Sequence, residues 1–156
     1  MSKLNYKTKS DGQLIQKSKY YNVKSFYKDS ELMDMFLRLK ANVCDLNPAL
    51  VTKCITGTEQ DFILLMNRAK DFIESMFPKT GLEEKNILLE MFRECVFGYY
   101  VLTPLIVAKD VSDIKVLDFD HIVVKANGER YVTDIRFSSE EDYKSWYERI
   151  HRIQKL

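Results

Sequence analysis

The stretch of sequence that decides the fold is HIVVKANGERYVTDIRF, residues 121–137. Two runs rich in β-branched and aromatic residues, His121 to Ala126 and Arg130 to Phe137, flank the pair Asn127-Gly128. An Asn-Gly pair between such runs is the strongest short-range hairpin signal, because a type I′ turn needs positive φ at both central residues. The sequence therefore predicts an antiparallel β-hairpin here.

The segments on either side predict a small sheet and a closing helix. Ile114 to Val116 has the composition of a short strand, and Thr103 to Ile106 that of a short helical turn. Ser138 and Glu141 have the spacing of a capping box. Apolar residues then recur at helical spacing, at Tyr143, Trp146, Tyr147, Ile150 and Ile153. We expect this C-terminal helix to cover one face of the sheet.

Before the sheet, the hydrophobic period is that of helices. The expected helical runs cover residues 29–46, 49–55, 58–77 and 80–96. Asn47-Pro48 and Phe77-Pro78 end the first and third runs, because the residue before a proline avoids the α region. Thr80 and Glu83 form a second expected capping box. N-terminal helices, a small antiparallel sheet with a β-hairpin and a covering helix together predict an α+β fold.

Length and composition exclude several classes of protein. The chain has 156 residues, which is enough for about one domain with its own core. No run approaches the 18 apolar residues of a membrane-spanning helix, and the N-terminus lacks the apolar region of a secretory signal. None of the five glycines precedes a lysine, so a phosphate-binding loop is absent. The sequence predicts no catalytic residue, cofactor or metal in this chain.

The charge is distributed unevenly. Residues 1–28 contain seven lysines and one acidic residue, a net charge of +6, so the rest of the chain carries −5. Aromatic residues alternate with these lysines, and helical periodicity is weak. We expect a basic arm, extended or flexible, whose candidate interaction residues are Lys17, Lys19, Tyr20, Tyr21 and Lys24. It is either a solvated tail or a contact for nucleic acid or an anionic membrane surface.

The cysteines and histidines have no spacing typical of a site. Cys44 and Cys95 lie at helical positions beside apolar residues, so we expect reduced, structural thiols. Zinc would need clustered ligands, which are missing. His121 and His151 are expected at the surface.

The carboxylates and aromatic residues also have an ordinary structural interpretation. Four aspartates bracket the first strand and are expected to shape turns, with a divalent ion as the alternative: Asp110, Asp113, Asp118 and Asp120. Four glutamates, Glu83, Glu84, Glu90 and Glu94, are expected on a solvated helix face. The stripe Tyr143, Trp146 and Tyr147 is expected to pack in the core. Arg136 and Arg149 are candidates for anion contacts or for surface ion pairs.

A series of short motifs after residue 97 resembles a known family. The motifs are GYYVLTPLI (98–106), DVSDIKV (110–116), IVVK (122–125), NG (127–128), TDIRF (133–137) and SSEE (138–141). In this order and spacing, over roughly residues 82–150, they resemble the N-terminal domain of type II/IV secretion ATPases, the traffic ATPases of pilus assembly, protein secretion and conjugation. The resemblance is greatest to the branch that drives tight-adherence pili. The family usually has Asn-Gly-Pro after the second motif, where this chain has Val116 to Phe119.

The resemblance implies a regulatory and assembly domain rather than a motor. It divides the chain into the arm (1–28), a helical lead-in (29–97) and a small α+β domain (98–156). In relatives this domain packs on the ATPase core of a ring hexamer and faces the inner-membrane platform. The resemblance also implies a protein that is cytoplasmic and peripheral to the inner membrane. The family's nucleotide-contacting arginines and Walker A loop come later than Leu156, so ATP and Mg²⁺ are implied for a longer parent protein. The alternatives are a stand-alone adaptor that binds a secretion ATPase or platform, or a nucleic-acid-binding domain that uses the arm.

Overall fold

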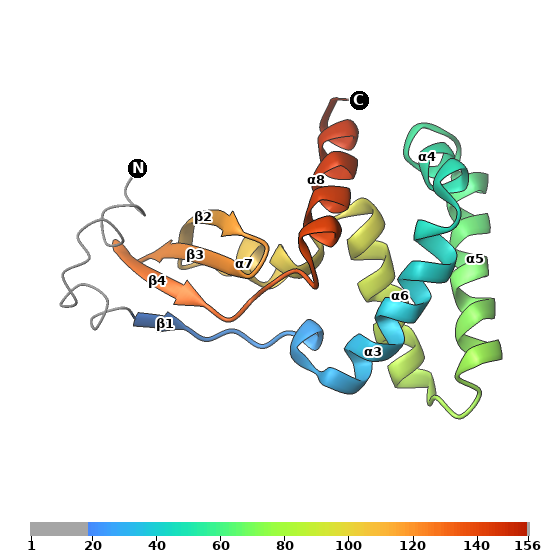
Figure 1. Cartoon of the computed structure of the whole chain (residues 1–156), viewed down its shortest axis with the longest axis horizontal. Helices are drawn as coiled ribbons and strands as arrows, with labels where there is room; N and C mark the ends of the chain where they lie inside the picture. Colours follow the sequence, from blue (N-terminus) through green and yellow to red (C-terminus); the bar gives the residue numbers. More distant parts are fainter. Residues whose placement is uncertain (1–18, 156) are drawn as a thin grey trace.

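The computed structural model describes residues 19–155 and has two parts joined side by side (Figure 1). The helical part contains α3 (Ser30–Leu39), η2 (Lys40–Asp45), α4 (Pro48–Thr56), α5 (Glu59–Met76) and α6 (Leu82–Phe97). The second part is a four-stranded sheet, preceded by the short helices η3 (Tyr100–Leu102) and α7 (Thr103–Val107). The C-terminal helix α8 (Glu140–Lys155) lies where the two parts meet. The α+β class predicted from the sequence is confirmed.

The sheet has the strand order β1-β4-β3-β2. Its strands are β1 (Lys19–Tyr21), β2 (Val111–Asp118), β3 (His121–Ala126) and β4 (Glu129–Thr133). The last three form the predicted antiparallel meander, and β2 is longer than the sequence indicated. β1 adds a parallel edge strand beside β4, so the sheet is mixed rather than purely antiparallel. β1, which belongs to the basic arm, therefore joins a sheet whose next strand in sequence, β2, begins 90 residues after β1 ends.

The second hairpin strand is shorter than predicted. The sequence favoured strand from Arg130 to Phe137, but β4 ends at Thr133. The Thr133 hydroxyl donates to the Ile122 carbonyl at 2.8 Å and accepts from the Ile135 amide at 3.3 Å. These bonds replace the strand ladder and turn the chain away, so that Ile135 and Phe137 enter the core.

The hairpin turn has the predicted conformation. Asn127 has a φ of 52° and Gly128 a φ of 80°, as a type I′ turn requires. We expect Gly128→Ala to lower the free energy of unfolding by about 1–2 kcal/mol, because an L side chain is strained at positive φ. Chemical denaturation would measure this loss. Gly81→Ala is the matched control, since Gly81 has a φ of −69° and open space where a Cβ would lie. Equal losses in the two variants would contradict the prediction.

Both capping boxes predicted from the sequence are wrong by one residue. The N-cap of α6 is Gly81, which makes no side-chain bond, so Thr80 lies outside the helix. At α8 the first helical residue is Glu140, and the Ser139 hydroxyl accepts from the Asp142 amide at 3.0 Å. The acidic partner is consequently Asp142 rather than Glu141, which places a carboxylate on the buried side of the helix.

One hydrophobic core runs through both parts of the molecule. Phe137, from the sheet side, lies 5.6 Å from the ring of Tyr100 and 5.4 Å from that of Trp146. Tyr100 in turn lies 5.7 Å from Phe36 of α3. The expected cover of a sheet face by α8 differs from the structure, in which α8 packs along α6 and the Trp146 indole donates to the Gly98 carbonyl at 2.8 Å. Among the described residues, no helix is both long and apolar enough to cross a membrane.

Candidate functional site

The predicted interaction residues of the arm do not form one cluster. Lys17 lies outside the described residues. Lys19 forms an ion pair with Glu129, and the Tyr21 hydroxyl donates to the Asp110 carboxylate at 2.6 Å. Tyr20 is exposed.

A third contact of the same kind lies further along the arm, where the Lys28 ammonium is 2.9 Å from the Asp134 carboxylate. The described part of the arm therefore contacts acidic residues on or beside the sheet. These contacts agree with the positive net charge of the arm and the negative net charge of the rest of the chain.

Lys24 and Arg136 lie at separate places. Lys24 lines a groove of about 470 Å³ together with Phe26, Pro104 and Val107. The Arg136 guanidinium lies over the Phe119 ring, 5.3 Å from its centroid. The structure thus gives Arg136 a local aromatic contact, whereas Lys24 borders a cavity.

The carboxylate of Glu94 reaches the same groove and is not on a fully solvated face, as the sequence suggested. It is half-buried and accepts a hydrogen bond from the Tyr27 hydroxyl at 2.9 Å. Burial raises the pKa of Glu94, an effect that the Tyr27 bond partly opposes. Its neighbour Glu90 does lie at the surface, paired with Arg93.

The raised pKa of Glu94 predicts how the stability of the fold depends on pH. The folded protein holds the Glu94 proton more tightly than the unfolded chain, so ionisation costs stability above the folded pKa and the cost is relieved as the pH falls through it. We expect Glu94→Gln, which keeps an acceptor for Tyr27, to be slightly more stable than wild type at pH 7. The advantage should vanish towards pH 4 in denaturation series. A gap that widens on acidification would refute this.

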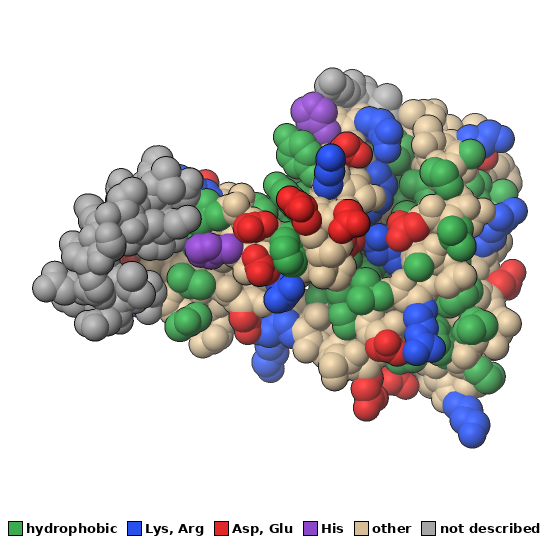
Figure 2. All heavy atoms as spheres, viewed as in Figure 1, with side chains coloured by type: hydrophobic (Ala, Val, Ile, Leu, Met, Phe, Trp, Pro, Cys, Tyr) green, Lys and Arg blue, Asp and Glu red, His purple; other side chains and the backbone are tan. Residues whose placement is uncertain are grey.

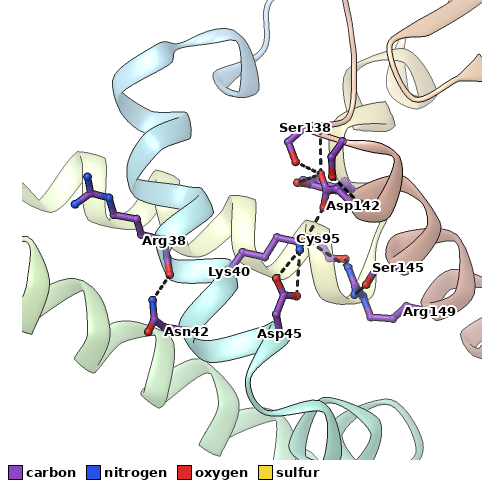
Figure 3. Close-up of polar contacts among 11 residues, drawn as sticks. Arg38, Lys40, Asn42, Asp45, Cys95, Ser138, Asp142, Ser145 and Arg149 are labelled. Carbon is purple, nitrogen blue, oxygen red and sulfur yellow. Dashed lines mark hydrogen bonds and ion pairs between the residues drawn. The ribbon is translucent and has the colours of Figure 1, made fainter.

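Three buried charged residues, Lys40, Asp142 and Arg149, gather between α3, η2, α6 and α8, in a cluster that we call the polar junction and that Figure 3 shows in part. Its members are Lys40, Asp45, Cys95, Tyr100, Ser138, Asp142 and Arg149, of which Asp45 and Ser138 are exposed. Lys40 and Asp45 begin and end η2, a π-helical turn that continues α3. Such turns are rare and occur frequently at functional sites. The Lys40 ammonium contacts both carboxylate oxygens of Asp45, at 2.9 and 3.1 Å.

Asp142 is the centre of the polar junction. One carboxylate oxygen lies 3.3 Å from the Lys40 ammonium. The other accepts from the Tyr100 hydroxyl at 2.8 Å and from the Ser138 amide and hydroxyl at 3.1 and 2.8 Å. Asp142 and Lys40 are only 4% and 7% exposed, so this is a buried ion pair, and the Asp142 oxygen that faces Lys40 has no hydrogen-bond partner among the described residues. It ties the start of α8 to the end of α3.

The environment keeps these groups in their usual charge states. Burial works to lower the pKa of Lys40, but the neighbouring Cys95, Asp142 and Asp45 outweigh it and the net direction is upward. Burial raises the pKa of Tyr100 well above its usual value, and the nearby Cys95 and Asp142 add to the effect. Lys40 is therefore a fixed cation and Tyr100 a fixed hydrogen-bond donor at neutral pH, which suits a structural junction.

Arg149 completes the cluster from the next turns of α8. It is 4% exposed and donates to the Cys95 carbonyl at 3.1 Å and the Ser145 hydroxyl at 2.8 Å. Of the two alternatives that the sequence left open for Arg149, the surface ion pair is therefore wrong, because the side chain is buried. Burial raises the pKa of the Cys95 thiol, and Cys44 behaves likewise. Cys44, Cys54 and Cys95 are all buried and unpaired in the structure, as structural thiols would be.

The remaining candidates take largely ordinary places. His151 is exposed and stacks on Tyr147, and His121 is half-buried. Trp146 is buried as predicted, but Tyr147 is half exposed. Asp118 accepts from the Phe119 amide at 2.8 Å, which is the expected turn chemistry. Within residues 19–155, no group of three potential ligands could hold a metal ion.

Sequence patterns did not identify Lys40 or Asp142, although a signal for Lys40 was present. Lys40 follows the apolar stripe Phe36 and Leu39 on the inner face of its helix, where a charged side chain needs a buried partner. Asp142 is distant in sequence, so its role becomes visible only in the fold.

Neither protein-family models nor curated proteins provide a match to this chain. The fold and the polar junction therefore define a small α+β protein with a buried ionic link between its helical and sheet parts.

Proposed function

We propose that this chain is the N-terminal regulatory and assembly domain of a hexameric secretion or pilus-assembly ATPase, of the tight-adherence pilus branch. One observation carries the proposal. The ordered motifs of residues 98–141 fold as the continuous unit α7-β2-β3-β4-α8, and the helices that precede them in sequence pack on that unit. This order of elements, together with the order of the motifs, supports the proposal.

The polar junction supports a mechanical role. A buried ion pair whose partners come from η2 and α8 resists sliding between the helical and sheet parts, because separation would leave the Asp142 carboxylate without its cation. The helical and sheet parts would then move together when a bound neighbour moves. We propose that it contacts the ATPase core, neighbouring subunits and an inner-membrane platform protein. ATP and Mg²⁺ would bind the parent protein outside this chain, at a cytoplasmic complex peripheral to the inner membrane.

The reading frame after the codon for Leu156 tests this proposal. We expect it to continue into a Gly-x4-Gly-Lys-Ser/Thr segment. The full-length product should form hexamers and hydrolyse ATP, whereas residues 1–156 alone should not. A stop codon directly after Leu156 would overturn the proposal in this form and leave the stand-alone adaptor.

The nucleic-acid alternative draws less support from the contacts. Lys19 and Lys28 of the arm already pair with carboxylates of the sheet unit. If the arm bound DNA, affinity would fall steeply with salt and with replacement of the lysines between Lys3 and Lys28. Binding that is absent or insensitive to salt would remove this alternative.

A further inference from the structure

A second groove borders the polar junction on its outer side. It has a volume of about 300 Å³ and lies between α4, η2 and α8. Its polar lining residues are Asp45, Thr52, Ser145, Glu148, Arg149 and Arg152. Arg149 and Arg152 are three residues apart on α8 and so present their side chains on one face of the helix.

Arg149 is a buried cation without a carboxylate partner. Among the described residues, no acidic oxygen lies within 4.0 Å of its guanidinium, which donates only to the neutral acceptors Ser145 and Cys95. Its Nε has no hydrogen-bond partner within residues 19–155. A guanidinium that is 4% exposed normally pairs with a carboxylate or an oxyanion, since an unpaired buried charge is costly.

The nearby carboxylates contact Lys40 rather than Arg149, although the Asp142 oxygen that faces Lys40 accepts no hydrogen bond among the described residues. Asp45 places both oxygens on Lys40, and Asp142 is shared between Lys40 and Tyr100. Glu148 lines the groove from an exposed position and forms no ion pair among the described residues. Lys40 therefore contacts two carboxylates, whereas Arg149 contacts none among the described residues.

We propose that this groove binds a phosphate group, with Arg149 and Arg152 as its cationic contacts and the Thr52 hydroxyl as a further donor. Two guanidinium groups and a hydroxyl offer more donors than a single carboxylate can accept, whereas a phosphate has three or four acceptor oxygens. The volume of the groove fits inorganic phosphate or the end of a phosphate ester. This site is independent of the ATPase assignment, because every residue involved lies in this chain.

Titration of the full 156-residue chain with inorganic phosphate tests the site, followed by NMR amide shifts at constant ionic strength against chloride. We expect saturable shifts centred on residues 48–52 and 145–152. Arg152→Gln should weaken binding about tenfold, the value of one charge-assisted hydrogen bond. Glu148→Gln should strengthen it by removing a repelling charge. Lys144→Gln is the matched control, since it removes one positive charge from an exposed position of α8 outside the groove.

A second experiment, with vesicles of phosphatidylcholine that contain phosphatidic acid, distinguishes a lipid headgroup from free phosphate as the source of the phosphate group. Binding to these vesicles that depends on Arg152, without binding of free phosphate, would support a lipid headgroup as the ligand. Arg152→Gln is chosen over Arg149 variants because Arg152 is exposed and its replacement leaves the core intact. The proposal is overturned if neither form of phosphate binds, or if Arg152→Gln and Lys144→Gln weaken binding equally.

Discussion

Asp142→Ala should lower the free energy of unfolding by about 3–5 kcal/mol, the cost of removing one partner of a buried ion pair. The substitution deletes the carboxylate that contacts Lys40 and takes three hydrogen bonds from Tyr100 and Ser138. Tyr100 is fully buried, so its hydroxyl would be left without an acceptor. Lys40 keeps Asp45 as a partner, which prevents a still larger loss.

Denaturation with urea, followed by circular dichroism, measures the effect. Asp34→Ala is the control, because Asp34 pairs with Arg38 at the surface and should contribute less than 1 kcal/mol. A double-mutant cycle with Lys40→Met isolates the ion pair, since the second replacement removes the cation that Asp142 contacts. If Asp142→Ala costs no more than Asp34→Ala, Asp142 is not the centre of the junction.

Local patterns in the sequence were sufficient to predict the meander and the helices. The Asn127-Gly128 turn, the proline-terminated helices and the α+β class all depend on residues within a few positions of one another. Each of these signals reflects backbone preferences that act locally, so a single sequence contains them.

Apart from the two capping boxes, which were wrong by one residue, the features that failed depend on contacts that are distant in sequence. β1 joins the sheet beside β4 because Lys19, Tyr21 and their acidic partners meet across 89 to 110 residues. The polar junction likewise joins Lys40 to Asp142. It also joins Arg149 to Cys95, which lie 54 residues apart in the sequence. Nothing near Lys40 in the sequence identifies which carboxylate it meets. The outward-facing groove beside Arg149 depends on the same long-range arrangement.

The space-filling view shows how these charges are divided between surface and interior (Figure 2). Acidic and basic side chains are mixed over the visible face, and no single-sign surface dominates it. Lys40, Asp142 and Arg149, in contrast, are buried and hold the halves together. The ionic groups that matter most for stability are therefore the ones that composition and net charge describe least.

Phe137→Ala should cost about 3–5 kcal/mol of unfolding free energy, because it leaves a cavity in the core. Phe137 is fully buried and its ring touches Tyr100, Tyr143 and Trp146. These contacts join the chain leaving the sheet to the helical part and to α8. The loss should therefore weaken both halves, and amide hydrogen exchange should speed up together in β3 and α6.

Phe137→Leu keeps most of the volume and should cost less than half as much, while Tyr147→Ala removes an aromatic ring that is 50% exposed and should have little effect. Faster exchange confined to the sheet, with α6 protected as in wild type, would show that the halves unfold separately. Joint loss of protection is expected because Tyr100 contacts Phe137 on one side and Phe36 on the other, so the cavity lies within the one core that both halves share.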